Sequence, residues 1–340
     1  HRMCGIVGIL GNEPVAGHLV EALRRLEYRG YDSAGIATLD HGALESRRAE
    51  GKLQALANRL AKEPLAGNTG IGHTRWATHG KPSETNAHPQ ATDRVAVVHN
   101  GIIENFRELR ERLIAGGAKF RSETDTEVVA HLVTEELNKG KSPVEAVAAS
   151  LKQLRGAFAL AFLFAGEDDL MIGARKGSPL AVGYGKGEMF LGSDAIALAP
   201  FTDTISYLDD GDWVILHRKS VEIRDDKDHK VERPVIKSSA SAQLVDKGNH
   251  KHFMAKEIHE QPEVVGHTLA HYIDMVHEKV ALPGKLPFDW KKLKRLSISA
   301  CGTAYYAGLV AKYGFERFAK LPVEIDIAAE FRYRGAPLEG

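Results

Sequence analysis

Closely spaced strand-like runs fill residues 156–224 and constrain the fold more than any other feature. Each run is short and apolar, and Gly, Asp or Pro separates it from the next. No gap is long enough for the helix that connects parallel strands, so the spacing predicts an antiparallel sheet system. The expected strands span residues 156–164, 170–175, 180–184, 189–193, 204–208, 212–216 and 221–224.

Helical patterns precede these strands. Apolar residues recur at amphipathic spacing in 15–26, and good helix formers fill 106–115, 128–137 and 142–154. Thr124 followed by Glu127 is typical of a helix N-cap. Together the patterns predict an α/β (α+β) domain in which helical layers cover the sheets.

Composition excludes several classes of protein. The chain has 340 residues, of which 43% are hydrophobic and 26% charged, so it is globular and long enough for two domains. Lys plus Arg and Asp plus Glu both number 45, so no charge excess favours a nucleic-acid or membrane partner. Two distant cysteines form no disulfide framework, and no apolar run reaches the roughly 18 residues of a membrane span. We therefore expect a cytoplasmic protein.

Cys4 stands at the head of a β-prone run bounded by glycines, C-G-I-V-G-I-L-G. Cysteine attacks acyl carbons readily because part of it is thiolate at neutral pH. Taken alone, the pattern favours a buried cysteine in an edge strand. We interpret residues 1–3 as a tag remnant with an initiator methionine. Their removal would give Cys4 a free α-amine, a base that titrates near about 8.

Residues 72–80, G-H-T-R-W-A-T-H-G, crowd polar and aromatic side chains between glycines. A packing strand would carry Val and Ile, so this composition predicts a ligand-binding loop. Arg29, in an earlier R-G-Y-D segment, is either solvated or placed to bind a carboxylate. A metal site at His73, His79 and His88 is the competing interpretation. No cysteine or carboxylate joins them at a metal spacing, which disfavours it.

A β-branched run ending at Val98 predicts a strand, and Asn100-Gly101 follows it. Asn-Gly is a turn signal, so a plain hairpin explains the pair. An Asn amide beside a glycine N–H also makes an oxyanion hole, and both interpretations stay open here. Further along, Asp125 either belongs to a helix cap or binds an ammonium group.

The second half of the chain has a different pattern. Residues 225–251 are charged and contain serines, and we place the domain boundary there. Helix is expected at 252–265 and through 272–276, followed by a strand, helix and strand at 295–300, 305–319 and 323–327. This βαβ unit predicts a parallel sheet, and its Gly-Thr turn is a weak anion-site signal. Acidic residues at 209–212 lack the later ligands of a calcium loop.

Eight motifs occur in one order along the chain: C-G-I-V-G, E-Y-R-G-Y-D-S-A-G, H-T-R-W-A-T-H-G, N-A-H-P, H-N-G-I-I-E-N, S-E-T-D-T-E, F-M-x-K-E-I-x-E-Q-P and A-C-G-T. In this order they resemble the glutamine–fructose-6-phosphate aminotransferase (isomerising) family, the glucosamine-6-phosphate synthases. The resemblance covers nearly the whole chain.

The resemblance implies an N-terminal-nucleophile αββα four-layer sandwich, a class II glutamine amidotransferase domain, at residues 4–240. A linker and helical lead-in would follow at 241–294. Residues 295–340 would be the incomplete start of a parallel-sheet, doubly wound sugar-isomerase (SIS) domain. The resemblance also implies L-glutamine and fructose-6-phosphate as substrates, a homodimer, no cofactor and no metal.

The family's functional residues match positions of this chain. By this resemblance Cys4 is the nucleophile, and Asn100 with Gly101 forms the oxyanion hole. Trp76 matches the gate of an ammonia channel, and Thr303 matches a sugar-phosphate contact. The residues that would bind glutamine or line its pocket are Arg29, Arg75, Thr78, His79, His88 and Asp125. Arg75 would hold the α-carboxylate and Asp125 the α-amine, which agrees with the cation and anion that a zwitterion requires.

Ala304 stands where a serine is usual. The chain also departs from the family pattern in two larger respects: Cys4 is not first, and the isomerase's Ser-rich phosphate loop and catalytic Glu, His and Lys would lie past Gly340. We therefore expect only the glutaminase half-reaction from these residues. Two other interpretations remain. One is another class II amidotransferase with a different ammonia acceptor, against which the Cys301-Gly302-Thr303 turn argues. The other is a catalytically silent sugar-phosphate-binding protein.

Overall fold

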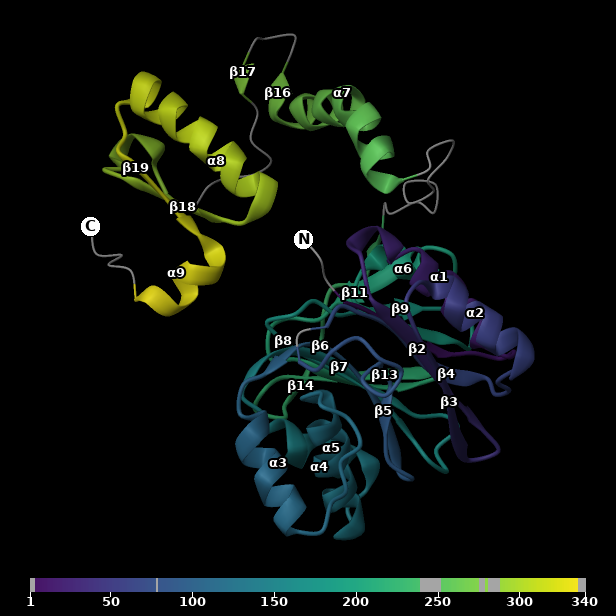
Figure 1. The fold of residues 1–340 in the computed structure, drawn as a ribbon. Helices are drawn as coiled ribbons and strands as arrows, with labels where there is room; N and C mark the ends of the chain where they lie inside the picture. The colour runs from purple at the N-terminus through teal and green to yellow at the C-terminus, as the bar shows by residue number, and fades with distance from the viewer. Residues whose placement is uncertain (1–3, 78, 239–251, 275–278, 281–287, 336–340) are drawn as a thin grey trace. The chain divides into compact units, whose positions relative to one another are not determined.

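The chain divides into two compact units, residues 2–248 and residues 249–340, and each is described by itself. The computed structural model in Figure 1 describes residues 4–77, 79–238, 252–274, 279–280 and 288–335. The first unit holds two sheets and most of the helices.

An eight-stranded antiparallel sheet forms one half of the first unit. In spatial order its strands are β15 (Ile236–Lys237), β11 (Thr204–Tyr207), β9 (Ala181–Tyr184), β10 (Met189–Gly192), β1 (Gly5–Leu10), β4 (Thr69–Arg75), β2 (Ser33–Asp40) and β3 (Ala43–Glu50). Inside the sheet, β1 and β4 are neighbours, and Gly5 pairs with Thr74. The beginning of β1 therefore lies beside the end of β4.

A seven-stranded antiparallel sheet forms the other half. In spatial order its strands are β14 (Lys230–Val231), β13 (Ser220–Arg224), β12 (Trp213–His217), β8 (Met171–Lys176), β7 (Gly156–Phe164), β6 (Val95–Ile103) and β5 (Gln90–Ala91). Every strand that the sequence predicted between residues 156 and 224 is confirmed, with ends that agree within one residue.

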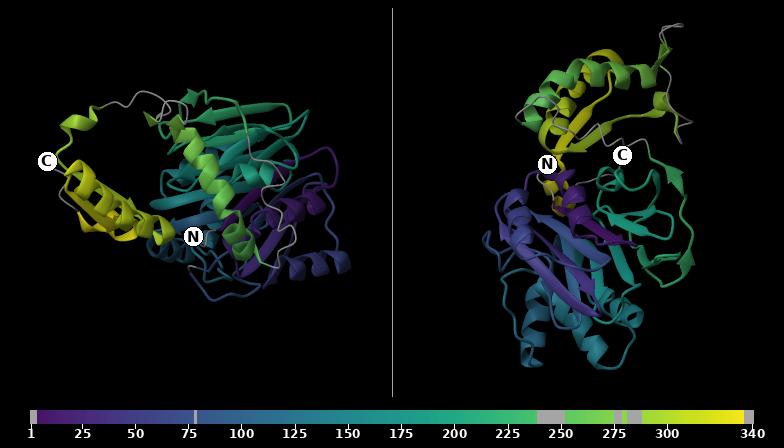
Figure 2. Two further views of the ribbon diagram at one scale, coloured as in Figure 1. Left: turned by 90° about the horizontal axis from the view of Figure 1, so that it is seen from above. Right: turned by 90° about the vertical axis from the view of Figure 1, so that its right-hand side faces the viewer.

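The two sheets pack face to face, and helices cover their outer faces (Figure 1, Figure 2). On the first sheet lie α1 (Ala16–Arg24), α2 (Leu53–Lys62) and α6 (Ala195–Leu198), with the short helix η1 (Glu27–Arg29) after α1. On the second sheet lie α3 (Phe106–Ala115), α4 (Thr126–Asn138) and α5 (Pro143–Leu151). Strand side chains alternate between a core between the sheets, with Ile6 and Leu10, and a core under the helices, with Val7 and Ile9.

Two segments that the sequence placed in a loop or a turn are strands. The first four residues of the loop predicted at 72–80 belong instead to β4, in which glycines replace Val and Ile because α1 packs closely above them. A Cβ at Gly70 would lie 2.7 Å from Leu19 Cδ1, and one at Gly72 would lie 3.1 Å from Leu23 Cδ1. The hairpin at Asn100-Gly101 is also wrong, because β6 continues through both residues to Ile103.

The predicted cap of α4 differs as well. Its N-cap residue is Asp125, one position after Thr124. The Glu127 carboxylate folds back instead and accepts backbone N–H groups of Arg121 at 2.8 Å and Ser122 at 2.6 Å. Glu127 thus fixes the loop that leads into α4 rather than completing a capping box.

The second unit contains a small parallel sheet. Its elements are α7 (Phe253–Tyr272), β16 (Ile273–Asp274), β17 (Lys279–Val280), η3 (Trp290–Lys292), β18 (Leu296–Ala300), α8 (Gly302–Gly314), η4 (Phe315–Ala319), β19 (Val323–Ile327) and α9 (Ala328–Arg334). Strands β18 and β19 are parallel with α8 between them in sequence, so the βαβ prediction is confirmed. The helix expected through 272–276 ends at Tyr272 instead, where a short antiparallel strand pair begins. The residues at 275–278 lie outside the described part.

The core under α4 and α5 supports a stability prediction. Phe162 of β7 is fully buried there, whereas Ile114 at the end of α3 is half exposed. Phe162→Ala should lower the free energy of unfolding by about 3–5 kcal/mol, because it leaves a cavity that the surrounding core cannot close. Ile114→Ala is the control and should cost less than about 1 kcal/mol. Urea unfolding measures both, and equal losses would contradict this description of the core.

Candidate active site

Cys4 lies directly before β1 and is half-buried. Its Sγ accepts a hydrogen bond from the Trp76 backbone N–H at 3.1 Å. Gly5 leaves room for Leu26, whose Cδ1 would lie 2.5 Å from a Cβ at that position. The edge-strand interpretation is wrong, because β10 and β4 flank β1 on both sides. The cysteine is therefore held at one end of the sandwich.

The Cys4 thiol is difficult to ionise. Burial raises its pKa above the ordinary value, and the Trp76 hydrogen bond and the charge of Arg75 oppose this less strongly. The thiol keeps its proton at neutral pH, so its use as a nucleophile requires a base.

Arg75 ends β4, and its side chain is buried. Its Nη2 donates to the backbone carbonyls of His79 and Gly80, the latter at 3.2 Å. Its buried Nη1 has no hydrogen-bond partner within the described ranges. Burial lowers the pKa of Arg75, and the nearby Asp32 carboxylate opposes this. A buried cationic donor in this state is costly unless an anion binds to it.

Asp125 presents a buried carboxylate at the start of α4. Its Oδ2 accepts the backbone N–H of Ile103 at 2.8 Å. Two histidines approach the same group, His99 Nδ1 at 3.8 Å and His79 Nδ1 at 4.0 Å. An ionised carboxylate has about four acceptor sites, so Asp125 keeps capacity for a cationic ligand.

Asn100 reaches from the second sheet to Cys4 in the first. Its Nδ2 donates to the Cys4 backbone carbonyl at 3.1 Å, and its Oδ1 lies 2.9 Å from His73 Nε2. Gly101 follows with a φ of 118°, and a Cβ there would lie 2.1 Å from the Ala157 carbonyl oxygen. Only glycine fits at position 101 without moving the strand. The Asn-Gly pair thus brings a side-chain donor to the cysteine.

Three buried histidines, His73, His88 and His99, surround this arrangement. His88 Nδ1 lies 3.4 Å from His73 Nε2, and the His88 and His99 rings lie 6.4 Å apart. Burial lowers the pKa of all three, that of His73 to about 3. His88, which the resemblance places at the pocket, packs against His73.

The remaining predicted residues are placed less fully. Trp76 is half-buried beside Cys4. Arg29 ends η1, but its side chain lies outside the described part of the chain, as does all of Thr78. Thr303 is exposed in the first turn of α8, in the second unit.

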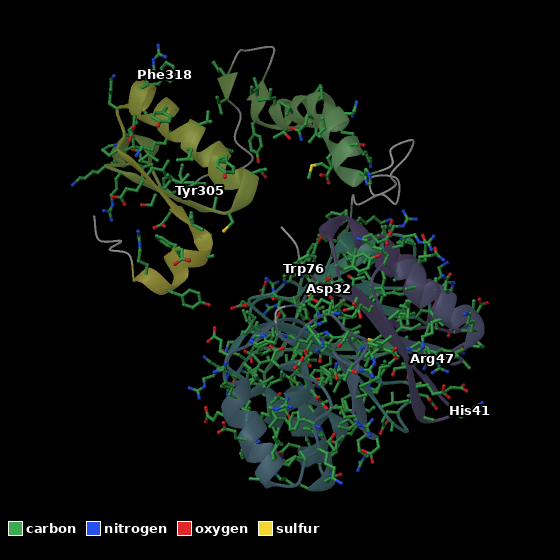
Figure 3. All side chains as sticks on the ribbon, viewed as in Figure 1. Asp32, His41, Arg47, Trp76, Tyr305 and Phe318 are labelled. Atoms are coloured by element: carbon green, nitrogen blue, oxygen red, sulfur yellow. The ribbon has the colours of Figure 1, made fainter. Side chains whose placement is uncertain are left out.

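Asp32 was not predicted as a site residue, and His73 was named only as a ligand of the disfavoured metal site. Asp32 Oδ2 accepts the Ala77 backbone N–H at 2.6 Å. This contact fixes the segment after β4, which begins with Trp76 (Figure 3). Asp32 lies within E-Y-R-G-Y-D-S-A-G, and His73 is the first residue of H-T-R-W-A-T-H-G. Polar residues inside otherwise apolar strand ends were the available signal.

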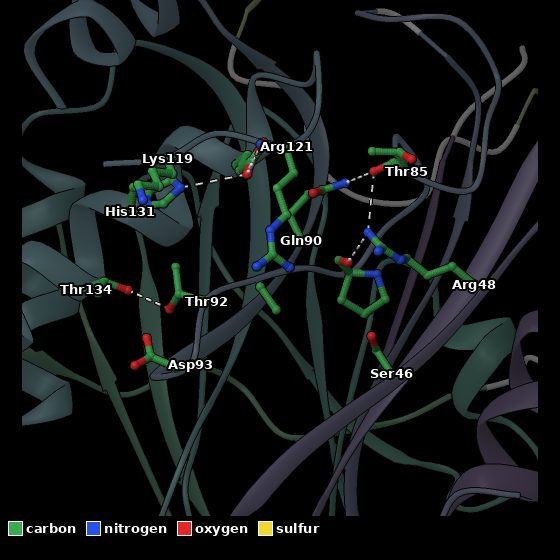
Figure 4. Close-up of a pocket in the computed structure, with 13 residues that line it drawn as sticks. Ser46, Arg48, Thr85, Gln90, Thr92, Asp93, Lys119, Arg121, His131 and Thr134 are labelled. Atoms are coloured by element: carbon green, nitrogen blue, oxygen red, sulfur yellow. Dashed lines mark hydrogen bonds and ion pairs between the residues drawn. The ribbon is translucent and has the colours of Figure 1, made fainter. Parts of the chain in front are cut away.

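A cavity of about 690 Å³ contains none of the predicted site residues (Figure 4). Two of its lining residues support the site from outside. Arg48 Nη1 donates to the carbonyls of Thr85 and Ala87, at 3.3 and 3.4 Å, in the segment that carries His88. Glu127 holds the loop before α4. The cavity is therefore lined by residues that hold the segments of the site, such as Arg48 and Glu127, and not by the predicted catalytic or binding residues.

No group of three His, Cys, Asp or Glu side chains within the described ranges could hold a metal ion. Among the helices of those same ranges, none has both the length and the apolar character needed to cross a membrane.

A family model described as a glutamine amidotransferase domain matches residues 73–200. The chain is 70% identical over 336 residues to glutamine–fructose-6-phosphate aminotransferase [isomerizing] of Bradyrhizobium diazoefficiens, with 99% of this chain and 55% of that protein covered. This chain is a homologue of the glutamine–fructose-6-phosphate aminotransferases. The protein of the same name from Brucella suis is 67% identical, with the same coverage. This chain thus spans about half the length of the curated relatives it matches.

Solved structures share the fold of this homologue. The allosteric regulatory enzyme of purine biosynthesis matches with a TM-score of 0.57 and 26% identity, over 65% of this chain and 49% of that one. Glutamine phosphoribosylpyrophosphate amidotransferase from B. subtilis matches with a TM-score of 0.60 and 19% identity, over 99% of this chain and 71% of that one. The homologue has the α/β fold of class II glutamine amidotransferases, with a small parallel sheet in its second unit.

The buried histidines make the stability of the homologue depend on pH. His73, His88 and His99 have lowered pKa values in the fold, whereas an unfolded histidine titrates near about 6.5. Below that pH the unfolded chain binds more protons, so stability should fall as the pH falls from about 6.5 toward 3. Each such histidine contributes a slope of up to about 1.4 kcal/mol per pH unit.

Urea unfolding between pH 5 and 7.5 measures this slope above the range in which Glu127, with a pKa lowered to about 2, contributes. His73→Gln should reduce the slope of unfolding free energy against pH by up to about 1.4 kcal/mol per pH unit, the contribution of one proton. His41→Gln is the control, because the His41 side chain is 96% exposed. An equal slope in the wild type and His73→Gln would contradict the prediction.

Proposed function

We propose that this homologue hydrolyses L-glutamine through a thioester on Cys4, and that the ammonia serves the synthesis of glucosamine-6-phosphate from fructose-6-phosphate. The observation that carries the proposal is the donor that Asn100 brings to Cys4 from the opposite sheet, at 3.1 Å from its carbonyl. A thiol with an amide donor fixed beside it is the arrangement that acyl transfer requires.

Glutamine binding is assigned to the two buried charges of the site. The α-carboxylate would bind Arg75, whose Nη1 is buried without a partner within the described ranges. The α-ammonium would bind Asp125, which keeps acceptor capacity beyond its contact with Ile103. Opposite charges in one site select a zwitterion over a simple amide. Arg29, Thr78, His79 and His88 are assigned to the surroundings of this site.

The chemistry then proceeds in two steps. The Cys4 Sγ attacks the side-chain amide carbon, and the developing oxyanion is stabilised by Asn100 Nδ2 and the Gly101 N–H. The carbon–nitrogen bond breaks, ammonia leaves with the proton taken from the thiol, and a glutamyl thioester remains. Water attacks the thioester and releases glutamate.

The base for this reaction is assigned to the α-amine of Cys4, freed when residues 1–3 are removed. Burial raises the pKa of the thiol, so a base is needed. A terminal amine titrates near about 8, which leaves a useful neutral fraction at pH 7.

The acceptor half is proposed from the relatives. Both curated relatives are named for fructose-6-phosphate, which favours a sugar-isomerase assignment for residues 295–340, an amidotransferase domain at 4–240 and the connecting segment at 241–294. Thr303 is the proposed sugar-phosphate contact and Trp76 the proposed ammonia gate. A cytoplasmic homodimer completes this proposal.

Labelling of the cysteines tests the nucleophile. With residues 1–3 removed, a glutamine-mimicking electrophile should alkylate Cys4, and the protein should release glutamate from glutamine. Cys301, half-buried at the start of α8, should stay unlabelled. Cys4→Ser should abolish both signals, and Cys301→Ser is the matched control. Peptide mapping that finds the label on Cys301 would refute the assignment.

The same assay separates the alternatives. Glutamate release that responds to fructose-6-phosphate supports the proposed acceptor. Release that ignores fructose-6-phosphate favours another class II amidotransferase. No release after removal of residues 1–3 favours a catalytically silent sugar-phosphate-binding protein.

Asp125→Asn tests substrate binding. The amide oxygen of Asn can still accept the Ile103 N–H, so the substitution removes the charge and keeps the structural contact. KM for glutamine should rise about 10- to 150-fold, which corresponds to about 1.5–3 kcal/mol for a hydrogen bond to a charged group. The value of kcat should change much less. Asp93→Asn, at an exposed position, is the control. A lost kcat at unchanged KM would make Asp125 catalytic instead.

A further inference from the structure

The orientation of the Asn100 amide is determined by its two neighbours. Its two ends contact the Cys4 carbonyl at 3.1 Å and His73 Nε2 at 2.9 Å. A backbone carbonyl only accepts hydrogen bonds, so the end of the amide that faces Cys4 must be Nδ2. The other end, Oδ1, only accepts, and His73 Nε2 must therefore carry the hydrogen.

His73 is built into the sandwich so that this hydrogen bond persists. The side chain is fully buried and belongs to β4, which lies between β1 and β2 in the first sheet. The ring of His88 packs against it with a centroid distance of 4.4 Å. Burial lowers the pKa of His73 to about 3, so the ring is neutral and carries one hydrogen across the range in which proteins work. Of the two neighbours of Nε2, Asn100 Oδ1 at 2.9 Å is nearer than His88 Nδ1 at 3.4 Å, so the hydrogen is assigned to Asn100.

We propose that His73 is a positioning residue, which donates from Nε2 to Asn100 Oδ1 and so keeps the Nδ2 donor of Asn100 facing Cys4. The inference rests on the proposed role of Asn100 in stabilising the oxyanion. Nδ2 has two hydrogens, of which the Cys4 carbonyl takes one, and the second remains for the oxyanion. If the amide rotated by half a turn, its oxygen would face the oxyanion and repel it.

His73 is not the base that deprotonates Cys4. A ring whose pKa is about 3 does not take up the thiol proton at neutral pH. Its effect therefore passes through Asn100 and concerns the tetrahedral intermediate alone. Substrate binding and the nucleophilicity of Cys4 should be independent of it.

Two variants separate the hydrogen bond from the bulk of the ring. His73→Gln keeps an N–H donor at about the distance of Nε2, whereas His73→Leu fills the space without a donor. For glutamine hydrolysis by the chain with residues 1–3 removed, His73→Leu should lower kcat about 100-fold, near the effect of deleting an oxyanion-hole donor. KM should stay within a few fold. His73→Gln should recover most of kcat, and His41→Leu is the control at an exposed histidine.

A second readout detects general damage to the site. Alkylation of Cys4 by iodoacetamide displaces iodide and forms no oxyanion, so its rate should be the same in His73→Leu and the wild type. In an Asn100→Ala background, His73→Leu should have little further effect on kcat, since the two residues act as one unit. A full additional loss in that background, or equal kcat in His73→Leu and the wild type, would overturn the inference.

A spectroscopic measurement keeps the inference testable if His73→Leu does not fold or if the wild type releases no glutamate. The latter result would refute the proposed function and not this contact. Nitrogen-15 NMR of labelled histidine in the wild type should find His73 as the neutral Nε2–H form between pH 5.5 and about 8, a window that lies above its pKa of about 3. Asn100→Ala should change that resonance. A Nδ1–H form, or a charged ring, would refute the contact.

Discussion

The hydrogen bond from Asn100 to the Cys4 carbonyl joins the two sheets at the site, and it depends on strand alternation in both of them. In β6, Ala96 and Val98 face the core between the sheets, so Asn100 lies on the same face. In β4, Ile71 faces that core, which places His73 and Arg75 on the same face two and four positions later. A shift of one residue in either strand would turn these groups toward the helices. The apolar core thus sets the register that the polar end requires.

In the part of the chain that the structure describes, buried polar atoms without hydrogen-bond partners are concentrated at this end of the sandwich. Seven buried side-chain nitrogens or oxygens within the described ranges have no hydrogen-bond partner, and five of them belong to site residues: His73, Arg75, His79, His88 and His99. Buried polar atoms in proteins are nearly always bonded, so such a cluster needs an explanation. The ligand proposed here supplies one for Arg75. His73, His88 and His99 are tolerated because burial keeps them neutral, and the cores under α1 and under α4 and α5 provide the compensating apolar burial.

The sequence predicted the antiparallel strands well because their apolar runs and turns are local signals. It failed at residues 72–75, where β4 carries glycine because α1 packs closely against it, a contact that no local pattern reveals. The hairpin interpretation at Gly101 failed for a related reason. The Ala157 carbonyl that excludes a side chain there belongs to β7, which neighbours β6 in the sheet but is distant in the sequence. The motifs identified Cys4, Arg75 and Asp125 as site candidates through resemblance. They gave His73 no role beyond the disfavoured metal site, because the function of a histidine inside a strand is not evident until its partner is known.

The position of Cys4 explains why the proposed base should be its own amine. His73 commits its one hydrogen to Asn100, and His88 and His99 have pKa values lowered by burial, so these rings are weak bases. The environment that raises the thiol pKa acts in the opposite direction on an amine, because burial disfavours the charged form of each. An amine on Cys4 would therefore be more fully neutral at pH 7 than an exposed one. The guanidinium of Arg75 would add to this effect, since it favours the thiolate and disfavours a neighbouring ammonium. Burial and one cation thus keep the amine in the neutral form that can accept the thiol proton, provided that the bond before Cys4 has been cleaved.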